Sequence, residues 1–386
     1  MSRVKKFSVT LTIFVSLLTF VIGAALGFCA NYLTDKQNNP IFKSDVVYGE
    51  GISFHFLELG NGKTGDSIFI QTATTDILVD AGSRTNSAST IESYVKDKMT
   101  DDVLEFVIAT HADQDHIACF AGDNTNPSLF KRFEVATIID FPKTNKELLT
   151  EKGNDTVYGT YVKERDAEVG LGAKHFNALD CYNNVGEAKR SYDLGGNVTL
   201  NILYNYFYDH EDGDENNYSV CFQIEDGDSK FLFTGDLEAE GEEKLVQNNT
   251  LSKVKLFKAG HHGSPTSSND CLLSVIQPEI CVACCCAGSV EYTDNLANTF
   301  PSQAFIDRIS NYTTQVFVPT VGTIVEDGTK KDGSINYEDV SFASLNGNIV
   351  VTSKKGNVTV ECSNNNTVLK DTTWFKTYRT TPTAWA

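Results

Sequence analysis

The sequence predicts an α+β fold in which two packed β-sheets are covered by helices. Short segments rich in β-branched and aromatic residues recur between glycines, which is typical of strands. Patterns with helical spacing lie between some of these segments and become more frequent in the later part of the chain. The apolar fraction of 41% in 386 residues suits a globular core. These observations favour one large domain over two.

The individual elements follow from the same patterns. The expected strands, in chain order, are Ile52–Leu57, Ser67–Gln71, Asp76–Val79, Val103–Ala109, Val135–Asp140, Val198–Tyr204, Ser219–Ile224, Lys230–Thr234, Val254–Ala259, Ile280–Cys286 and Val316–Val318. The expected helices are Ser89–Lys98, Thr156–Val169, Glu238–Gln247, Asn269–Ile276 and Ser302–Ile309. The polar residues 330–341 predict a loop. Residues 348–361 predict a hairpin that turns at Lys355-Gly356.

An uncharged segment near the N-terminus, residues 7–33, is long enough to cross a bilayer. Three basic residues precede it, so the positive-inside rule keeps the N-terminus in the cytoplasm and places the remainder outside the cell. A cleaved signal peptide, which would leave a secreted protein, is the alternative. We therefore expect a transmembrane anchor or signal peptide within residues 1–38, an extracellular main domain at 39–346, and a hairpin and tail at 347–386.

The composition restricts the partners and the cysteine chemistry. Acidic residues outnumber basic ones by 51 to 32, which gives a net charge of −19. This argues against a broad, nonspecific grip on DNA or RNA, although bound divalent metal ions would offset the charge locally. Four of the ten cysteines lie in Cys281–Cys286. Because no second CxxC pair follows, this run predicts buried small side chains in a strand rather than a zinc ribbon.

A cluster of metal-ligating side chains occupies residues 110–116, which read Thr-His-Ala-Asp-Gln-Asp-His. The cluster directly follows the apolar segment Val103–Ala109, so we expect it on the loop after a buried strand. Imidazole nitrogens and carboxylate oxygens suit zinc, manganese or iron, and alternating donors let one short loop serve two neighbouring ions. A solvated loop with two incidental histidines is the alternative.

Two later strand ends carry the same residue types. The apolar strand Phe231–Thr234 runs into Gly235-Asp236, although an isolated Gly-Asp pair is more often an ordinary turn. Leu256–Ala259 leads into residues 260–263, which read Gly-His-His-Gly. Four of the seven histidines of the chain thus lie in two strand-end loops. Chance placement explains this distribution poorly, so the sequence predicts one metal site built from several strand ends.

These stretches resemble a known family. HADQDH at residues 111–116, the aspartate of LFTGD at residues 232–236 and LFKAGHHGS at residues 256–264 are similar to motifs of the metallo-β-lactamase fold. They resemble in particular the extracellular metallohydrolase domain of the competence protein ComEC, and the likeness covers most of residues 47–325. The resemblance implies a four-layer αββα fold, with the transmembrane helix and the C-terminal hairpin as extensions.

The resemblance also implies two divalent metal ions, zinc or manganese. Their ligands would be His111, Asp113, Asp115, His116, Asp236 and one of His261 and His262. His111 and Asp113 would hold the first ion, and Asp236 would bridge the two. For the second ion we slightly favour His262 over His261.

Further residues have implied roles around the ions. Asp80 would orient a ligand through a hydrogen bond, and Lys258 and Ser264 would contact an anionic substrate. Many relatives have a histidine where this chain has Asn217 or its neighbour Asn216, which leaves the first ion weakly bound. The His-Pro of ComEC-like domains is Phe300-Pro301 here, so one imidazole of the site is missing.

The implied chemistry is hydrolysis by a metal-activated water, with Asp115 or Asp236 accepting a hydrogen bond that orients it. Asp113 replaces the second histidine of the lactamase pattern, which favours phosphate esters over lactams. The sequence therefore predicts an exported, membrane-tethered phosphodiesterase whose substrate is nucleic acid or a surface polymer. One alternative is a phosphorylcholine esterase that acts on cell-surface phosphodiesters. Another is a noncatalytic binding module whose metal site is eroded at Asn217 and Phe300.

Overall fold

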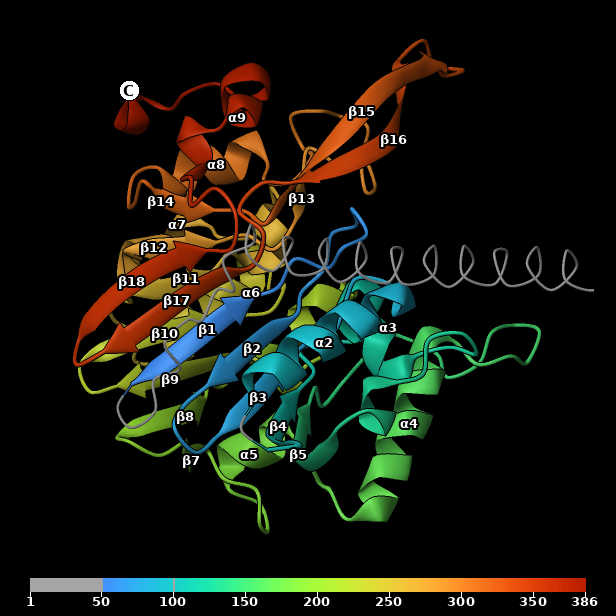
Figure 1. The fold of residues 1–386 in the computed structure, drawn as a ribbon, viewed down its shortest axis with the longest axis vertical. Coiled ribbons are helices and arrows are strands. Elements are labelled where there is room, and N and C mark those ends of the chain that lie inside the picture. Colours follow the sequence, from blue (N-terminus) through green and yellow to red (C-terminus); the bar gives the residue numbers. More distant parts are fainter. Residues whose placement is uncertain (1–50, 100) are drawn as a thin grey trace, which may run out of the picture. The chain divides into compact units, whose positions relative to one another are not determined.

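The computed structural model describes residues 51–99 and 101–386, whose strands form two large β-sheets and a smaller one (Figure 1). In spatial order, the eight-stranded sheet contains β18 (Asn357–Cys362), β17 (Ile349–Lys354), β1 (Ile52–Phe56), β2 (Ile68–Gln71), β3 (Asp76–Val79), β4 (Val103–Ile108), β5 (Glu134–Asp140) and β6 (Lys174–Asn177). The seven-stranded sheet contains β14 (Gln315–Phe317), β12 (Ile280–Val282), β11 (Leu256–Lys258), β10 (Ser229–Phe233), β9 (Phe222–Asp226), β8 (Val198–Ile202) and β7 (Ser191–Asp193). The smaller sheet contains β13 (Cys286–Ala287), β15 (Thr320–Thr329) and β16 (Ile335–Ser344).

The helices divide between the two large sheets. The α-helices are α2 (Ala88–Lys98), α3 (Gln114–Ala121), α4 (Val157–Leu171), α5 (Ala178–Asn183), α6 (Ala239–Asn248), α7 (Asp270–Ile276), α8 (Gln303–Ile309) and α9 (Thr373–Tyr378). Figure 1 shows α2, α3 and α4 beside the eight-stranded sheet. Buried side chains of α6, α7 and α8 instead pack on the seven-stranded sheet. The order of layers is therefore helices, sheet, sheet, helices.

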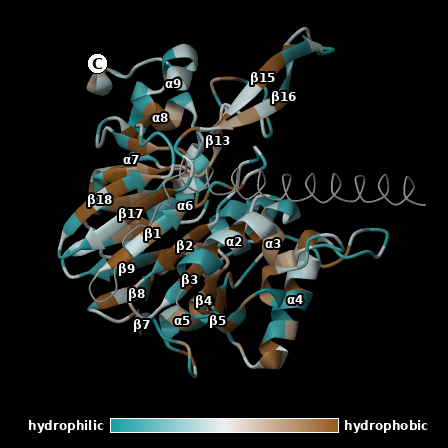
Figure 2. Ribbon diagram, in the orientation of Figure 1, coloured by the Kyte–Doolittle hydropathy of each residue, from teal (hydrophilic) through white to brown (hydrophobic). Residues whose placement is uncertain are grey.

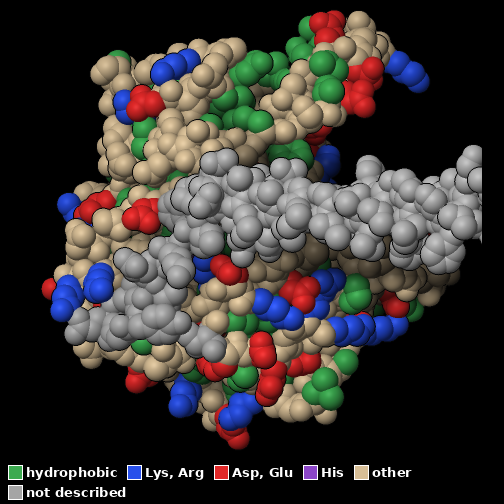
Figure 3. All heavy atoms as spheres, viewed as in Figure 1, with side chains coloured by type: hydrophobic (Ala, Val, Ile, Leu, Met, Phe, Trp, Pro, Cys, Tyr) green, Lys and Arg blue, Asp and Glu red, His purple; other side chains and the backbone are tan. Residues whose placement is uncertain are grey.

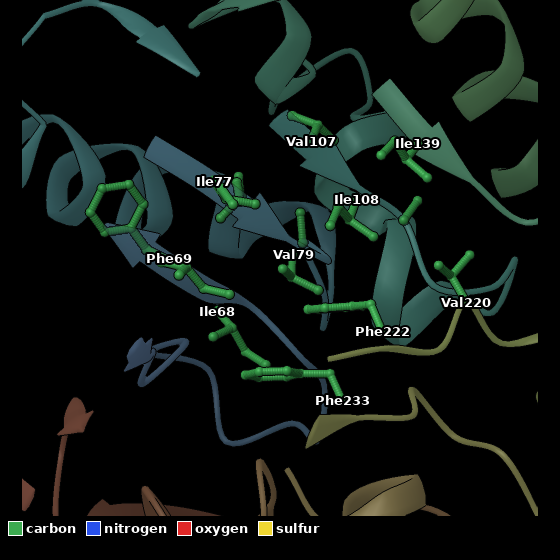
Figure 4. Close-up of a cluster of buried hydrophobic side chains, with 14 of the residues drawn as sticks. Ile68, Phe69, Ile77, Val79, Val107, Ile108, Ile139, Val220, Phe222 and Phe233 are labelled. Atoms are coloured by element: carbon green, nitrogen blue, oxygen red, sulfur yellow. The ribbon is translucent and has the colours of Figure 1, made fainter. Parts of the chain in front are cut away.

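Successive side chains of β10 point to opposite faces of the sheet and pack in two different hydrophobic cores. Phe231 and Phe233 point into the core between the sheets, whereas Leu232 between them packs with the helices on the other face. The Phe233 ring stacks on that of Phe222, with centroids 4.8 Å apart. Figure 4 shows these two rings next to Ile68 and Val79 of the opposite sheet. Figure 2 shows apolar residues concentrated in the central strands and a mixture on the outer helices.

Most predicted segments are confirmed to within a few residues, but Ile280–Cys286 is not a single strand. The chain leaves the seven-stranded sheet after β12 and turns at Ala283–Cys285, where the Cys285 N–H donates to the Ala283 carbonyl. It then enters the smaller sheet as β13, which pairs with β15. The sequence does not reveal this turn, because residues 280–286 are apolar and remain buried on both sides of it. As the sequence predicts, these cysteine side chains are buried, and all are free thiols.

The prediction of a loop at residues 330–341 is wrong. Most of this stretch belongs to the long hairpin β15–β16, which projects from the rest of the described chain and has its turn at residues 330–334 (Figure 1). Figure 3 shows charged side chains at its tip. Both faces of the hairpin are largely exposed, and even its apolar side chains, such as Val325, Ile335 and Val340, lie at the surface among charged residues. The stretch therefore has the polar composition that is typical of a loop.

The second hairpin turns at Lys355-Gly356 as the sequence predicts. Its first strand, β17, pairs with β1, so β17 and β18 extend the eight-stranded sheet at that edge. The predicted transmembrane segment, residues 7–33, lies outside the described residues. Within the described part of the chain, no helix is both long and apolar enough to cross a membrane.

Replacing Phe233 with alanine tests the packing between the sheets. Phe233 is 1% exposed, so its removal leaves a cavity that should lower the free energy of unfolding by about 3–5 kcal/mol. Leu171→Ala is the control, because Leu171 is 83% exposed and its loss should change that free energy by less than about 0.5 kcal/mol. Urea denaturation of both variants and the wild type measures the difference, and equal losses would contradict the assigned core.

Candidate metal centre

The predicted ligands lie where parallel strands of both sheets end. β3 and β4 are parallel neighbours in one sheet, and β10 and β11 are parallel neighbours in the other. Asp80 follows β3, residues 110–116 follow β4, Asp236 follows β10, and His262 follows β11. Because the carboxyl ends of parallel strands meet at one edge, four loops that are far apart in sequence converge there.

Four buried side chains meet at this edge. One ligand atom from each of Asp66, His116, Asp236 and His262 lies within 4.8 Å of the corresponding atoms of the others. The Nε2 atoms of His116 and His262 are 3.3 Å apart, and each is 3.1 Å from Asp236 Oδ2. Asp115 Oδ2 lies 3.3 Å from His262 Nε2. The structure thus brings together the predicted ligands Asp115, His116, Asp236 and His262.

Hydrogen bonds fix the tautomers of both imidazoles. His262 Nδ1 lies 3.0 Å from the carbonyl oxygen of Cys284, which can only accept, so Nδ1 carries the proton. His116 Nδ1 donates to Asp80 Oδ2 at 2.8 Å. Both Nε2 atoms of the neutral rings therefore present lone pairs to each other and to the Asp236 carboxylate. A buried group that consists only of acceptors needs positive charge in its centre, and a divalent cation fits this donor set.

Protons compete with a cation for these imidazoles. Burial alone would lower the pKa of His116, but the charges of Asp236 and Asp80 outweigh it and raise the pKa well above its usual value. For His262, burial is outweighed in the same way by Asp236 and Asp66. The pKa of Asp115 is lowered although burial would raise it, because His262 and His116 favour its ionised form. Metal ligation must therefore displace protons from both rings.

Three residues at the site have left-handed backbone conformations that side chains other than glycine seldom adopt. The φ angles are 54° at Asp80, 44° at His261 and 54° at His262. Each such residue costs of order 1 kcal/mol or more, so the surrounding loops must hold them in place. Because His261 and His262 are consecutive left-handed residues, their side chains point in different directions. His262 reaches the centre, whereas His261 Nδ1 lies 3.2 Å from Glu238 Oε1, outside it.

Asp66 belongs to the centre although the sequence did not single it out. It precedes β2 and is 1% exposed, and its Oδ1 lies 3.1 Å from His262 Nδ1. Burial would raise its pKa, but the charges of Lys258 and His262 lower it to about 2. The available signal was the pair Gly65-Asp66 next to an apolar strand, the same combination as Gly235-Asp236.

Lys258 is a structural cation of the centre. Its Nζ donates to the Gly235 carbonyl and to Asp236 Oδ1, both at 3.0 Å, and lies 2.5 Å from Asp66 Oδ2. The residue is 1% exposed and its three protons have partners. This burial points to a role in holding Asp66 and Asp236 rather than in contacting a substrate. Ser264, also 1% exposed, bonds to Thr266 and shapes its own loop.

The predicted ligands of the first ion are less complete. His111 is buried, and its Nε2 has no hydrogen-bond partner. This nitrogen lies 3.6 Å from Asp113 Oδ2, while Lys146 Nζ lies 2.5 Å from Asp113 Oδ1. The amide of Asn217 bonds to Asp212 and to the Glu238 backbone instead. A buried imidazole nitrogen without a partner, next to a carboxylate, suits a cation, but Lys146 competes for the carboxylate.

Comparisons with known proteins agree with this site. The model of the metallo-beta-lactamase superfamily matches residues 213–286. Recombination protein 2 of Haemophilus influenzae is 27% identical over 263 residues, which cover 66% of this chain and 26% of the relative. ComE operon protein 3 of Bacillus subtilis is 28% identical over 182 residues, or 46% of this chain and 20% of the relative.

The chain is similar to ComEC-like proteins of the metallo-β-lactamase superfamily. It spans about a quarter or less of the length of these curated relatives. The crystal structure of the metallo-β-lactamase fold protein YhfI from Bacillus subtilis covers 70% of this chain and 86% of its own, with 14% identity and a TM-score of 0.36. The match to the superfamily model, residues 213–286, contains Asp236 and His262 of the centre.

The two adjacent histidines offer a matched pair of variants. His262→Ala removes an imidazole from the centre and should lower the affinity for Mn²⁺ or Zn²⁺ at least about 10-fold, since even outer groups of metal sites carry effects of that size. His261→Ala should leave metal affinity within about threefold of wild type. Isothermal titration calorimetry of the chelator-treated proteins measures both. Equal losses in the two variants would contradict the assignment of His262.

The raised pKa values of His116 and His262 predict opposite pH dependences with and without metal. In the metal-free protein, protonation of these rings stabilises the fold below their unfolded pKa of about 6.5, and this stability is lost as pH rises through the raised values. Metal affinity should instead increase with pH, because ligation displaces the same protons. Thermal denaturation from about pH 6 to about pH 9, with a chelator and with Mn²⁺, measures both trends. A metal-free protein that becomes more stable across this range would contradict the site.

Proposed function

We propose that this ComEC-like chain is a metal-dependent hydrolase of phosphodiesters. The observation that carries the proposal is the buried centre of acceptors formed by His116, His262 and Asp236. Burial of such a group is costly unless a cation binds to it. When bound, a divalent ion would acidify a water molecule and stabilise charge on phosphoryl oxygens. The names of these two relatives refer to recombination and to the ComE operon, which fits a nucleic acid substrate.

The side chains of the centre have distinct proposed roles. Asp115, His116, Asp236 and His262 would hold the ion, and Asp80 fixes the His116 tautomer through its 2.8 Å hydrogen bond. Lys258 keeps Asp236 ionised and in place. Asp115 is the one of these carboxylates that is partly exposed, at 13% of its side chain. It is therefore best placed to accept a hydrogen bond from the attacking water and orient it.

We propose that a second ion is bound by His111 and Asp113, with Asp236 between the two ions. It should bind more weakly, because Asn217 is engaged elsewhere and Lys146 neutralises Asp113. A two-ion arrangement suits phosphodiesters, since both attacking and leaving oxygens need stabilisation. We further propose that the domain acts outside the cell, tethered by the N-terminal segment or released from it.

Lys146→Met tests the proposed weaker site. Loss of the ammonium frees the Asp113 carboxylate, so affinity for the second equivalent of Mn²⁺ should rise about 3- to 10-fold, as expected when one unit charge near the surface is removed. The first equivalent should bind as in wild type, which serves as the internal control. Titration followed by Mn²⁺ electron paramagnetic resonance counts both equivalents. A protein that never binds more than one equivalent, even without Lys146, would show that the centre holds a single ion.

Substrate class is tested by turnover of the full chain in the presence of Mn²⁺ or Zn²⁺. The proposal predicts cleavage of bis-p-nitrophenyl phosphate and of single-stranded DNA, and loss of at least about 100-fold in Asp236→Asn, which keeps the shape but removes a ligand charge. Cleavage of p-nitrophenyl phosphorylcholine alone would instead favour the phosphorylcholine esterase. No turnover by metal-loaded protein with any of these substrates would favour the noncatalytic binding module.

A further inference from the structure

The segment Gly288–Pro301 passes beside the metal centre and carries an exposed aromatic side chain. Tyr292 is 49% exposed, yet its hydroxyl donates a 2.6 Å hydrogen bond to Asp115 Oδ2. Large aromatic side chains are usually buried, so an exposed ring that is anchored at its hydroxyl end needs a reason. Its anchor is the same carboxylate that lies 3.3 Å from His262.

The ring of Tyr292 is the outer member of an aromatic stack that begins at the centre. Phe300 lies next to His262, with ring centroids 6.1 Å apart and an angle of 30° between the planes. Tyr292 stacks on Phe300, with centroids 5.5 Å apart and an angle of 27°. Phe300 is 8% exposed, so its faces are covered. The exposed surface of this stack therefore belongs to Tyr292.

The segment is held in this shape by a cation from the end of the chain. The guanidinium of Arg379, which follows α9, donates to the carbonyl oxygens of Leu296, Thr299 and Pro301 at distances from 2.7 to 3.1 Å. Burial of the guanidinium lowers its pKa to about 10. Because backbone groups on both sides of Phe300 are fixed, the aromatic stack is preformed and loses little conformational entropy when a ligand binds.

We propose that the open face of Tyr292 stacks against a nucleobase next to the scissile phosphodiester and thereby positions single-stranded nucleic acid on the metal centre. This proposal rests on the proposed phosphodiesterase function. A planar base is favoured over a quaternary ammonium group because a cation cage needs several ring faces turned toward one point. Here the rings are nearly parallel and one of them is covered, which extends a stack but forms no cage.

The charges near Tyr292 are compatible with a phosphate backbone. Arg84 pairs with Glu291, Lys330 pairs with Asp294, and Lys63 Nζ lies 3.8 Å from Asp339 Oδ2. Each cation is roughly one-third to two-fifths exposed, so a phosphate can contact it without full desolvation. These pairs balance the local charge in a chain whose net charge is −19. A short single strand is thus favoured over an extended duplex, which would need a broad positive surface.

Two oligomers of equal length and charge test the proposal, namely oligothymidylate and a chain of abasic tetrahydrofuran units joined by the same phosphodiesters. Stacking of one base changes affinity by about 5- to 150-fold, so wild-type protein loaded with Mn²⁺ should bind and cleave the thymidylate better by a factor in that range. Tyr292→Ala should bring this preference close to one by weakening only the thymidylate. Tyr292→Phe and Tyr292→Trp should keep it, because both retain a ring.

Binding is measured by fluorescence anisotropy and cleavage by gel electrophoresis. A Tyr292→Ala protein that retains the full base preference overturns the proposal, as does a wild-type protein without any preference. Tighter competition by tetramethylammonium than by thymidine would assign the ring to a quaternary ammonium substrate and would also overturn it. Absence of cleavage contradicts only the proposed phosphodiesterase activity, because the binding preference and its dependence on Tyr292 are measured independently.

Discussion

The structure depends on one electrostatic constraint, the burial of many hydrogen-bond acceptors around two imidazole nitrogens that face each other. His116 and His262 have their Nδ1 protons committed to Asp80 and to a backbone carbonyl, so only lone pairs remain for the centre. Asp236 adds negative charge between them. Burial of such a group is costly unless positive charge enters it. Lys258 supplies part of this charge permanently, and protons or a metal ion supply the remainder.

The fold makes this constraint possible because rigid strands bring the acceptors together. The loops after β3, β4, β10 and β11 come from both sheets, and the aromatic core between the sheets holds those strand ends in register. Left-handed backbone conformations at Asp80 and His262 then turn the side chains inward. The strain of these loops is therefore part of the site, as expected where function rather than packing selects the conformation.

Much of this arrangement could be predicted from the sequence, because it follows from local patterns. Residues 110–116 and 260–263 each follow an apolar segment and contain several potential metal ligands. The layers and the metal centre could therefore both be predicted. Part of residues 110–116 was still misassigned as loop, since α3 begins at Gln114 inside the cluster. Asp66 shares a local pattern with Asp236, a Gly-Asp pair beside an apolar strand, but its contact with Lys258 depends on how the two sheets stack. No local pattern contains that information.

The sequence also could not distinguish the roles of two residues that are adjacent in the chain. Spacing alone cannot separate His261 from His262, whose roles differ because consecutive left-handed residues point their side chains apart. The hairpin β15–β16 was not recognised for another reason: its apolar side chains, such as Val325, Ile335 and Val340, are exposed and lie among polar and charged residues. The C-terminal Arg379 could not be connected to residues 296–301 by sequence, because most of its partners are backbone carbonyls, which every residue has.

Anomalous X-ray diffraction from crystals of the Mn²⁺-loaded protein can show directly whether the buried centre binds the ion. We expect the strongest anomalous peak between the Nε2 atoms of His116 and His262 and the carboxylate of Asp236, at ligand distances of about 2.0–2.3 Å. A crystal that contains bound metal only elsewhere, for example at the cysteines Cys281 and Cys284, would contradict it. So would His116 and His262 remaining in direct contact while metal saturates the protein.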